Sequence, residues 1–168
     1  LAAYYLYRRI PAAADPLGPQ NILAFVPGLL TGTGAMMTGR WMVAGKSPLT
    51  GTWGDANCGG TMAPAIKGAG YDGIFFTGIS PKPVWLYLDH KKAELRDAAE
   101  LWGKDSRETE TLIQSQNKGK ALQVACIGPG GEMKSLIAGI VNDQGRMAAR
   151  SGLGAVMGSK LLKAVAVK

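Results

Sequence analysis

The hydrophobic residues of this chain occur in short runs, and turns rich in glycine, proline or polar residues separate them. Short apolar runs between turn signals are typical of buried strands, and alternating runs are typical of half-buried ones. The pattern predicts strands at 22–26, 41–44, 74–77, 84–88, 93–96, 122–127 and 162–167. The polar turn 89–92 joins two of them as a hairpin. The apolar run 136–141 fits a strand or a helix equally well.

Helical patterns occupy the remaining ordered stretches. The segment 1–10 is the end of a helix that Pro11 stops, and 62–68 is a short helix. A helix is expected at 106–116, with Ser106 as its N-cap beside Thr109 and Glu110. Residues 152–160 form a helix of small side chains. Short strands mixed with short helices indicate an α+β fold.

One sequence of features occurs twice along the chain. A strand, a turn of proline and glycine, an apolar stretch and a Gly-Arg pair follow one another at 25–40 and again at 124–146. Such an echo indicates two related lobes. These lobes would present their Gly-Arg loops, at Arg40 and Arg146, to a ligand where they join.

The charge and the glycine content narrow the choice of ligand. A net charge of +7 favours an anionic partner. The lysines are scattered and do not alternate with aromatic residues, so we do not expect nucleic acid. The 24 glycines lack a collagen period and indicate tight turns and close backbone approaches.

The residues that usually carry catalysis do not form a set here. Cys58 and Cys126 are the only cysteines and form no CxxC pair, so this chain alone provides no zinc or iron–sulfur site. His90 is the only histidine and reads as a solvated turn residue, which leaves Cys58 without a base. Two lone cysteines fit a reducing cytoplasm. No apolar run is long enough for a membrane span, and no signal peptide is visible.

Each Gly-Arg stretch has two interpretations. The glycines of 152–158 miss the dinucleotide-binding spacing by one residue, but they suit either an anion near a helix start or a tightly packed helix. Arg40 can bind a phosphate or form a structural ion pair. Asn57, which precedes Cys58 and two glycines, can offer an oxygen to Mg²⁺ or simply form a turn.

Taken together, the motifs resemble the N-terminal domain of the aldehyde ferredoxin oxidoreductase family, the tungsten-pterin enzymes. The matching stretches are in order and cover nearly the whole chain: Asp15-Pro16-Leu17, Gly39-Arg40, 46–51, Asn57-Cys58-Gly59-Gly60, 67–72, 101–105, Ile127-Gly128-Pro129, Asn142-Asp143 and 152–160. The chain departs from the family pattern at Met147, Ala149 and Ser151, where small residues are frequent, and at Cys58, where some members have serine.

The resemblance implies two pseudo-symmetric β-rich halves that form a base under a tungsten bis-pyranopterin (molybdopterin) cofactor, whose two phosphates a Mg²⁺ ion bridges. By analogy, the cofactor contacts would come from Arg40, Asn57, Gly59, Arg146, Met147, Ala149 and Arg150. Asn57 and the carbonyl of Met147 occupy the Mg²⁺-ligand positions. The glycines at 59, 152 and 154 would admit the pterins.

The resemblance also implies what the complete protein does. Residues 1–168 would be the N-terminal cofactor-binding domain of a longer cytoplasmic enzyme that oxidises a small aldehyde to a carboxylic acid. Its electrons would pass through a 4Fe–4S cluster, with ligands outside this chain, to ferredoxin or a partner subunit.

Two alternatives within the family stay open, namely a homodimer and membership of the benzoyl-CoA-reducing branch. The other class of function is a non-catalytic anion-binding or interaction module. If Arg40 and Arg146 lay on opposite sides of the domain, the cofactor hypothesis would fail.

Overall fold

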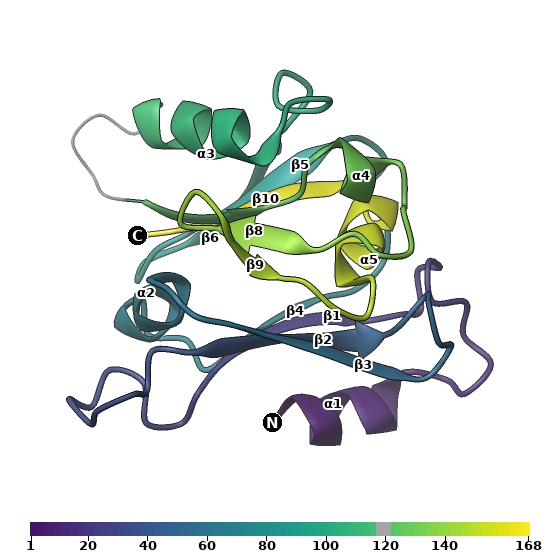
Figure 1. The fold of residues 1–168 in the computed structure, drawn as a ribbon, viewed down its shortest axis with the longest axis horizontal. Coiled ribbons are helices and arrows are strands. Elements are labelled where there is room, and N and C mark those ends of the chain that lie inside the picture. The colour runs from purple at the N-terminus through teal and green to yellow at the C-terminus, as the bar shows by residue number, and fades with distance from the viewer. Residues whose placement is uncertain (117–121) are drawn as a thin grey trace.

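The computed structural model describes residues 1–116 and 122–168, which form two β-rich halves, one stacked on the other (Figure 1). The elements, in chain order, are α1 (Ala2–Arg9), β1 (Leu23–Pro27), β2 (Trp41–Lys46), β3 (Trp53–Cys58), α2 (Met62–Gly68), β4 (Ile74–Phe76), β5 (Val84–Leu88), β6 (Ala93–Asp97), α3 (Ser106–Ser115), β7 (Gln123–Cys126), α4 (Pro129–Glu132), β8 (Ile140–Asn142), β9 (Arg146–Ala148), α5 (Leu153–Ser159) and β10 (Leu162–Val167). Two sheets with short helices confirm the expected α+β class.

The first half is an antiparallel sheet with the strand order β3-β2-β1-β4. Helix α1 lies on its outer face (Figure 1). The helix buries Ala2 and Leu6 against Ile22, Ala24 and Ala44, which removes its apolar side from water.

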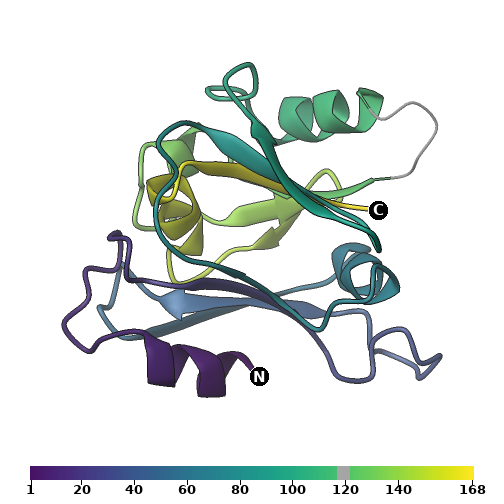
Figure 2. The ribbon, with the colours of Figure 1, turned by 180° about the vertical axis from the view of Figure 1, so that it is seen from behind.

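The second half is a sheet with the strand order β6-β5-β10-β7-β8-β9. Strands β5 and β10 are parallel, and the other pairs are antiparallel. Helix α3 covers its outer face and buries Ile113 beside Leu101, Leu122 and Val124. A single connection, 77–83, crosses from one half to the other (Figure 2).

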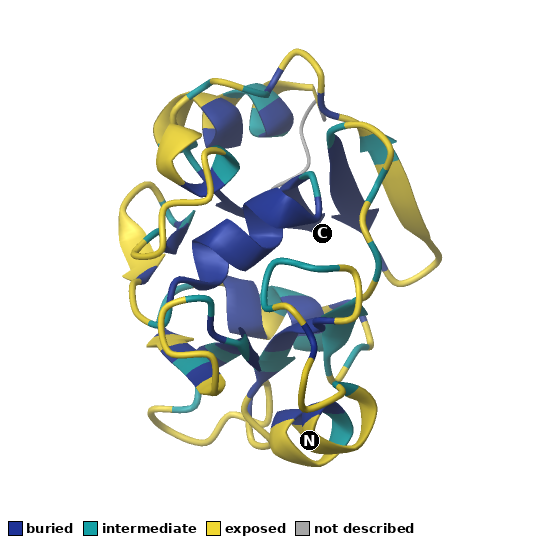
Figure 3. Ribbon diagram, turned by 90° about the vertical axis from the view of Figure 1, so that its right-hand side faces the viewer, coloured by how far each residue is buried: buried dark blue, intermediate teal, exposed yellow. Residues whose placement is uncertain are grey.

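The main core lies where the two sheets face each other, with α2 and α5 inserted between them (Figure 1). Helix α5 is buried along its whole length, as the dark blue helix between the halves shows (Figure 3). It contacts strands of both sheets as well as α4. The small residues of this helix allow that close packing from several sides.

The apolar pattern located most elements but not all of them. The expected ranges 62–68, 84–88 and 162–167 agree residue for residue with α2, β5 and β10. Strand β3 was missed because its buried positions hold only the small residues Gly54, Ala56 and Cys58, so the alternation carries little hydrophobic signal. The ambiguous run 136–141 ends in strand β8, and α4 and β9 are too short for a periodic pattern.

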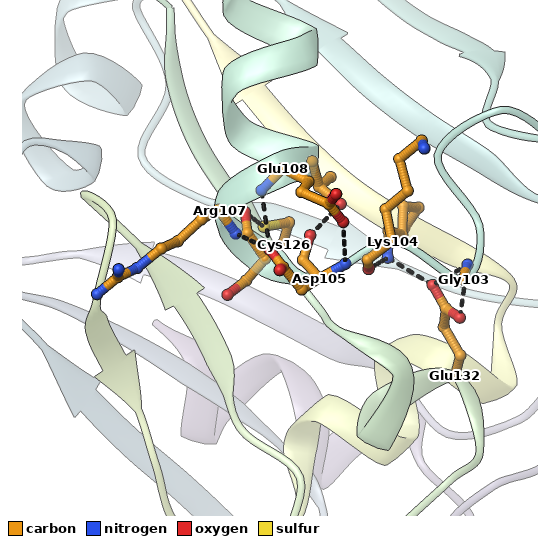
Figure 4. Close-up of polar contacts among 10 residues, drawn as sticks. Gly103, Lys104, Asp105, Arg107, Glu108, Cys126 and Glu132 are labelled. Atoms are coloured by element: carbon orange, nitrogen blue, oxygen red, sulfur yellow. Dashed lines mark hydrogen bonds and ion pairs between the residues drawn. The ribbon is translucent and has the colours of Figure 1, made fainter.

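The expected cap of α3 at Ser106 is wrong, because Asp105 is the N-cap. Its carboxylate accepts from the backbone N–H groups of Arg107 at 2.8 Å and Glu108 at 2.9 Å (Figure 4). The Glu108 side chain in turn accepts from the N–H of Asp105 at 3.2 Å, which completes a capping box.

The duplicated pattern has a structural counterpart with one shift. Strands β1 and β2 pair antiparallel across the first repeat, and β7 and β8 pair in the same way across the second. Arg40 directly precedes β2, whereas Arg146 begins β9, one strand later. The halves therefore correspond in strand pairing but not residue by residue.

Lys160 connects the two halves from the end of α5. Its side chain is buried, and Nζ donates to the backbone oxygens of Asn21 at 2.6 Å and Gly78 at 3.0 Å. Burial lowers the pKa of this amine from 10.5 to about 8.

The depressed pKa of Lys160 predicts a rise of stability with pH. Between pH 8 and 10.5 the unfolded chain binds a proton that the folded protein has released, so the folded state gains stability as pH increases. We expect the difference in unfolding free energy between the wild type and Lys160→Met to grow by about 1.4 kcal/mol per pH unit in this window. Denaturant titrations from pH 7 to 10 measure it, and parallel profiles of the two proteins would contradict the assignment.

Candidate functional site

Arg40 and Arg146, one from each half, meet at Gly59. A Cβ atom placed on Gly59 would lie 3.4 Å from Nη1 of Arg40 and 3.7 Å from Nη1 of Arg146. Both arginines are exposed, so the two cationic groups converge beside a bare peptide that solvent can reach. The expectation that the two Gly-Arg loops share one face is confirmed. We call Arg40, Asn57, Gly59 and Arg146 the arginine–glycine surface.

Pairing of β2 with β3 sets the position of Arg40. Trp41 lies opposite Cys58 and Met42 opposite Asn57. Arg40 therefore stands at the open end of the hairpin, where its Nε donates to the side-chain oxygen of Asn57. Its Nη2 also approaches the backbone oxygen of Asn57 at 3.4 Å. These contacts fix the direction of the guanidinium group.

Two side chains of the second half hold the loop that contains Gly59. Asn142 accepts a hydrogen bond from the Cys58 thiol at 3.0 Å and donates to the backbone oxygen of Gly59 at 3.2 Å. Asp143 accepts from the N–H of Thr61 at 2.8 Å and from its hydroxyl at 2.5 Å. We call this pair the Asn142–Asp143 clasp, because it fastens residues 58–61 of one half to the β8–β9 turn of the other.

The clasp could not be predicted from the sequence, where Asn142-Asp143 was only one of the motifs that match the family. Its partners, Cys58 and Thr61, lie more than 80 positions earlier in the chain, so only the fold shows the contacts. A local signal was present in the polar turn Asn-Asp-Gln-Gly, whose Asp143 and Gln144 have φ values of 48° and 59°. Asn and Asp are the side chains that best tolerate this left-handed region, which indicates a special turn.

The charges at this surface favour an anion. Arg146 Nε lies 3.8 Å from Asp143 Oδ2, and the Arg146 side chain is mostly exposed. Within residues 1–116 and 122–168, no carboxylate forms an ion pair with Arg40. Two neighbouring guanidinium groups repel each other unless an anion lies between them, and their flat donor geometry suits phosphate oxygens.

The other expected contact residues lie on the segment that leaves Arg146. Met147 is on the edge strand β9 opposite Val141, and Ala149 and Arg150 are exposed after that strand ends. Ser151 fastens this segment to the first half: its hydroxyl donates to the backbone oxygen of Asp55 at 3.0 Å, and its own backbone oxygen accepts from Ser47 at 2.8 Å. The roles of Met147, Ala149 and Arg150 stay predictions.

The expectation that Gly152 and Gly154 admit a ligand is wrong. A Cβ atom on Gly152 would lie 2.2 Å from the backbone oxygen of Leu136, and one on Gly154 would lie 2.4 Å from that of Gly139. Both glycines are buried against the protein's own backbone. Of the two interpretations of 152–160, the tightly packed helix is the correct one.

The described residues show no acid–base or nucleophilic set. The Cys58 thiol is buried, and burial raises its pKa above the ordinary value, although the nearby Arg40 opposes this shift. His90 is exposed in the β5–β6 turn, at the far edge of the other sheet. The described part of the chain contains no group of three or more His, Cys, Asp and Glu side chains placed to hold a metal ion. None of its helices has the length and apolar character needed to cross a bilayer.

Comparisons with known proteins identify the family of this chain. The family model described as "Aldehyde ferredoxin oxidoreductase, N-terminal domain" matches residues 1–168. The chain belongs to the aldehyde ferredoxin oxidoreductase family. It is 48% identical to the tungsten-containing aldehyde ferredoxin oxidoreductase of Thermococcus kodakarensis and 46% identical to that of Pyrococcus furiosus. Each alignment covers 100% of this chain but 28% of the relative.

A solved structure of the aldehyde ferredoxin oxidoreductase family has nearly the same fold. It is the active-site complex BamBC of benzoyl coenzyme A reductase in complex with 1,5-dienoyl-CoA. The TM-score is 0.96 at 42% sequence identity, over 99% of this chain and 25% of that one. The chain thus spans about a quarter of the length of the family members it matches, and it resembles their N-terminal domain.

A substitution at Gly60 tests how much the Asn142–Asp143 clasp contributes to stability. Gly60 has a φ of 105°, and a Cβ atom there would lie 1.9 Å from Asp143 Oδ2. We expect Gly60→Ala to displace Asp143 and to lower the free energy of unfolding by about 2 kcal/mol or more. Gly70→Ala is the matched control, because Gly70 also has a positive φ, of 90°, but a Cβ atom there meets nothing within 4 Å. Denaturant unfolding of both variants gives the comparison, and equal midpoints would show that the clasp is not needed.

Proposed function

We propose that this chain is the N-terminal, cofactor-binding part of a longer tungsten-dependent oxidoreductase, and that its arginine–glycine surface binds the phosphate-bearing pterins of the cofactor. The observation that carries the proposal is the convergence of Arg40 and Arg146 on Gly59. Tungsten appears in the names of the relatives that are 46–48% identical.

The residues present fit a bis-pyranopterin group. Arg40 and Arg146 supply two cations for two phosphates, one from each half. Gly59 has no side chain to keep a planar ligand away from the backbone. The amide oxygen of Asn57 accepts from Arg40 Nε with one lone pair and would offer its other lone pair to Mg²⁺, and the carbonyl of Met147 on the second half would offer a second oxygen. Ala149 and Arg150 extend the same surface along the segment after β9.

The share of this chain in the reaction is binding and electrostatics. The bound cofactor supplies the redox chemistry, in which an aldehyde becomes a carboxylic acid. The arginines neutralise the charge of the cofactor, and the Asn142–Asp143 clasp keeps both halves in the register that this requires. In the complete cytoplasmic enzyme, a 4Fe–4S cluster bound outside these residues would pass electrons to ferredoxin or to a partner subunit.

Reduction of benzoyl-CoA is the second candidate activity. It is supported by the TM-score of 0.96 and the 42% identity to the benzoyl coenzyme A reductase complex, only a few per cent below the identities to the aldehyde enzymes. A cofactor base built from arginines and backbone serves either reaction, because none of its described side chains needs to recognise the substrate.

Metal analysis and turnover of the complete protein test the proposal. The protein would be purified anaerobically from a tungsten-supplied source, and its tungsten, molybdenum, iron and pterin content measured. We expect tungsten with two pterins, and reduction of a viologen dye by aldehydes. Reductant-dependent conversion of benzoyl-CoA instead would favour the second candidate. A protein without metal or pterin would overturn both and leave an anion-binding module.

A further inference from the structure

The turn that leads into Arg146 has an unfavourable backbone. Asp143 and Gln144 are consecutive non-glycine residues in the left-handed region, with φ values of 48° and 59°. Hairpin turns use this conformation, and Asp143 tolerates it, but Gln144 is a residue type that rarely adopts it. The N–H of Gly145 donates to the Asn142 backbone oxygen at 3.2 Å and closes the turn, so the remaining polar groups of the turn depend on contacts outside it. The position of the Arg146 guanidinium therefore depends on whatever holds this turn.

The first half holds only one side of the turn. Asn142 and Asp143 contact residues 58–61 through the clasp. The next residue, Gln144, is held from the second half. Its backbone N–H donates to Oε2 of Glu110 at 2.9 Å. Glu110 reaches the turn from α3, the helix on the outer face of the second sheet.

Glu110 is a buried acidic residue without a basic partner among the described residues. Its side chain is buried, with 3% of the residue exposed, although it is a carboxylate. Its other oxygen, Oε1, accepts from Nε2 of Gln114 at 3.3 Å. Within residues 1–116 and 122–168, no basic side chain forms an ion pair with it.

The electrostatic surroundings of Glu110 oppose its charge. Burial raises the pKa of the Glu110 carboxyl above its ordinary value, the charge of Asp143 on the β8–β9 turn adds to this, and the N–H of Gln144 and the amide of Gln114 oppose it. A buried carboxylate in such a place destabilises the fold more than an apolar residue would. The hydrogen bond that it accepts from the Gln144 N–H is one that an apolar residue cannot form.

We propose that Glu110 is a positioning residue for the anion site: by accepting from the Gln144 N–H it fixes the β8–β9 turn, and so directs Arg146 toward Gly59. This inference rests on the proposed function, since it concerns the same site. The proposal gives an indirect role in ligand binding to α3, which lies on the outer face of the second sheet and not at the arginine–glycine surface (Figure 1).

The test uses the complete protein purified without cofactor and titrated with pyrophosphate by calorimetry. Glu110→Leu removes the acceptor and is expected to weaken pyrophosphate binding about tenfold. Glu110→Gln keeps an acceptor oxygen for Gln144 and is expected to bind within about threefold of the wild type. Leu101→Ala is the control for a general loss of stability, because Leu101 is buried under α3 and is not part of the clasp or the turn. It is expected to leave the affinity unchanged.

A double variant and hydrogen exchange separate positioning from stability. In the Arg146→Ala background, Glu110→Leu is expected to have no further effect on affinity, because the residue that it positions is gone. The Gln144 amide is expected to exchange at least tenfold faster in Glu110→Leu than in Leu101→Ala. If Glu110→Leu weakens binding equally with and without Arg146, or Leu101→Ala weakens it as much, the positioning role is refuted. If the wild type and Arg146→Ala bind pyrophosphate equally, the proposed anion site itself fails.

Discussion

Replacing Lys163 with methionine is expected to lower the free energy of unfolding by about 3–5 kcal/mol, the largest effect of any single change discussed for this protein. The substitution removes a buried cation but leaves its carboxylate partner, Glu132, in place. An uncompensated charge inside a protein is far more costly than the loss of a hydrogen bond.

The surroundings of Lys163 explain this magnitude. Its side chain is fully buried, and Nζ lies 2.5 Å from Oε1 of Glu132, whose own side chain is 6% exposed. Nζ also donates to the backbone oxygen of Lys104 at 2.7 Å. The Glu132 carboxylate additionally accepts from the N–H of Gly103 at 2.8 Å (Figure 4). The pair therefore joins α4, β10 and the loop before α3 inside the second half.

A surface ion pair of the same half serves as the control. Lys82 and Asp97 lie 2.6 Å apart, but their side chains are 64% and 50% exposed. Lys82→Met is therefore expected to cost less than about 1 kcal/mol. Denaturant unfolding of Lys163→Met and Lys82→Met measures the two losses of unfolding free energy. Equal losses of stability would mean that burial of the Lys163–Glu132 pair does not matter.

Removal of either arginine from the arginine–glycine surface is expected to weaken phosphate binding strongly. Charge-assisted hydrogen bonds contribute about 1.5–3 kcal/mol each, so Arg40→Ala and Arg146→Ala should each lower pyrophosphate affinity by about tenfold to a hundredfold. The double variant is expected to bind more weakly than either single one. Both arginines are exposed, so the fold should lose little stability. Calorimetric titration of the cofactor-free complete protein measures all of these affinities.

Arg8→Ala is the matched control for these variants. Arg8 is exposed on α1, outside the arginine–glycine surface, and its guanidinium lies over the ring of Tyr4. The substitution changes the net charge by the same amount. If Arg8→Ala weakened pyrophosphate binding as much as Arg40→Ala, the affinity would reflect the overall charge of +7 rather than a site.

The hydrophobic pattern predicted elements whose buried positions hold large or branched side chains. Val84–Leu88 was located to the residue because all five of its buried side chains are large or branched, and Leu162–Val167 because Leu162, Val165 and Val167 bound and punctuate its smaller residues. Strand β3 was not, because Gly54, Ala56 and Cys58 bury too little apolar surface to be recognised before their partners are known. Only pairing with β2 makes them a strand.

The site was predictable in part. Arg40, Asn57, Gly59 and Arg146 were selected from motifs, and the structure brings Arg40, Gly59 and Arg146 together with Asn57 beside them. The clasp and Glu110 were not selected, because their roles depend on contacts between residues 34 to 84 positions apart. Gly152 and Gly154 were wrongly expected to admit the ligand, for the same reason. They make room for the backbone at Leu136 and Gly139, and only the fold shows that this backbone lies against them.

A crystal structure of the complete protein, purified anaerobically with its cofactor, tests the central claim most directly. Anomalous scattering would locate the tungsten, and the electron density would locate the pterin phosphates. We predict phosphate oxygens within hydrogen-bonding distance of both Arg40 and Arg146, with the ligand lying directly over Gly59. A cofactor bound elsewhere, with the two arginines paired to carboxylates of the protein instead, would contradict the account.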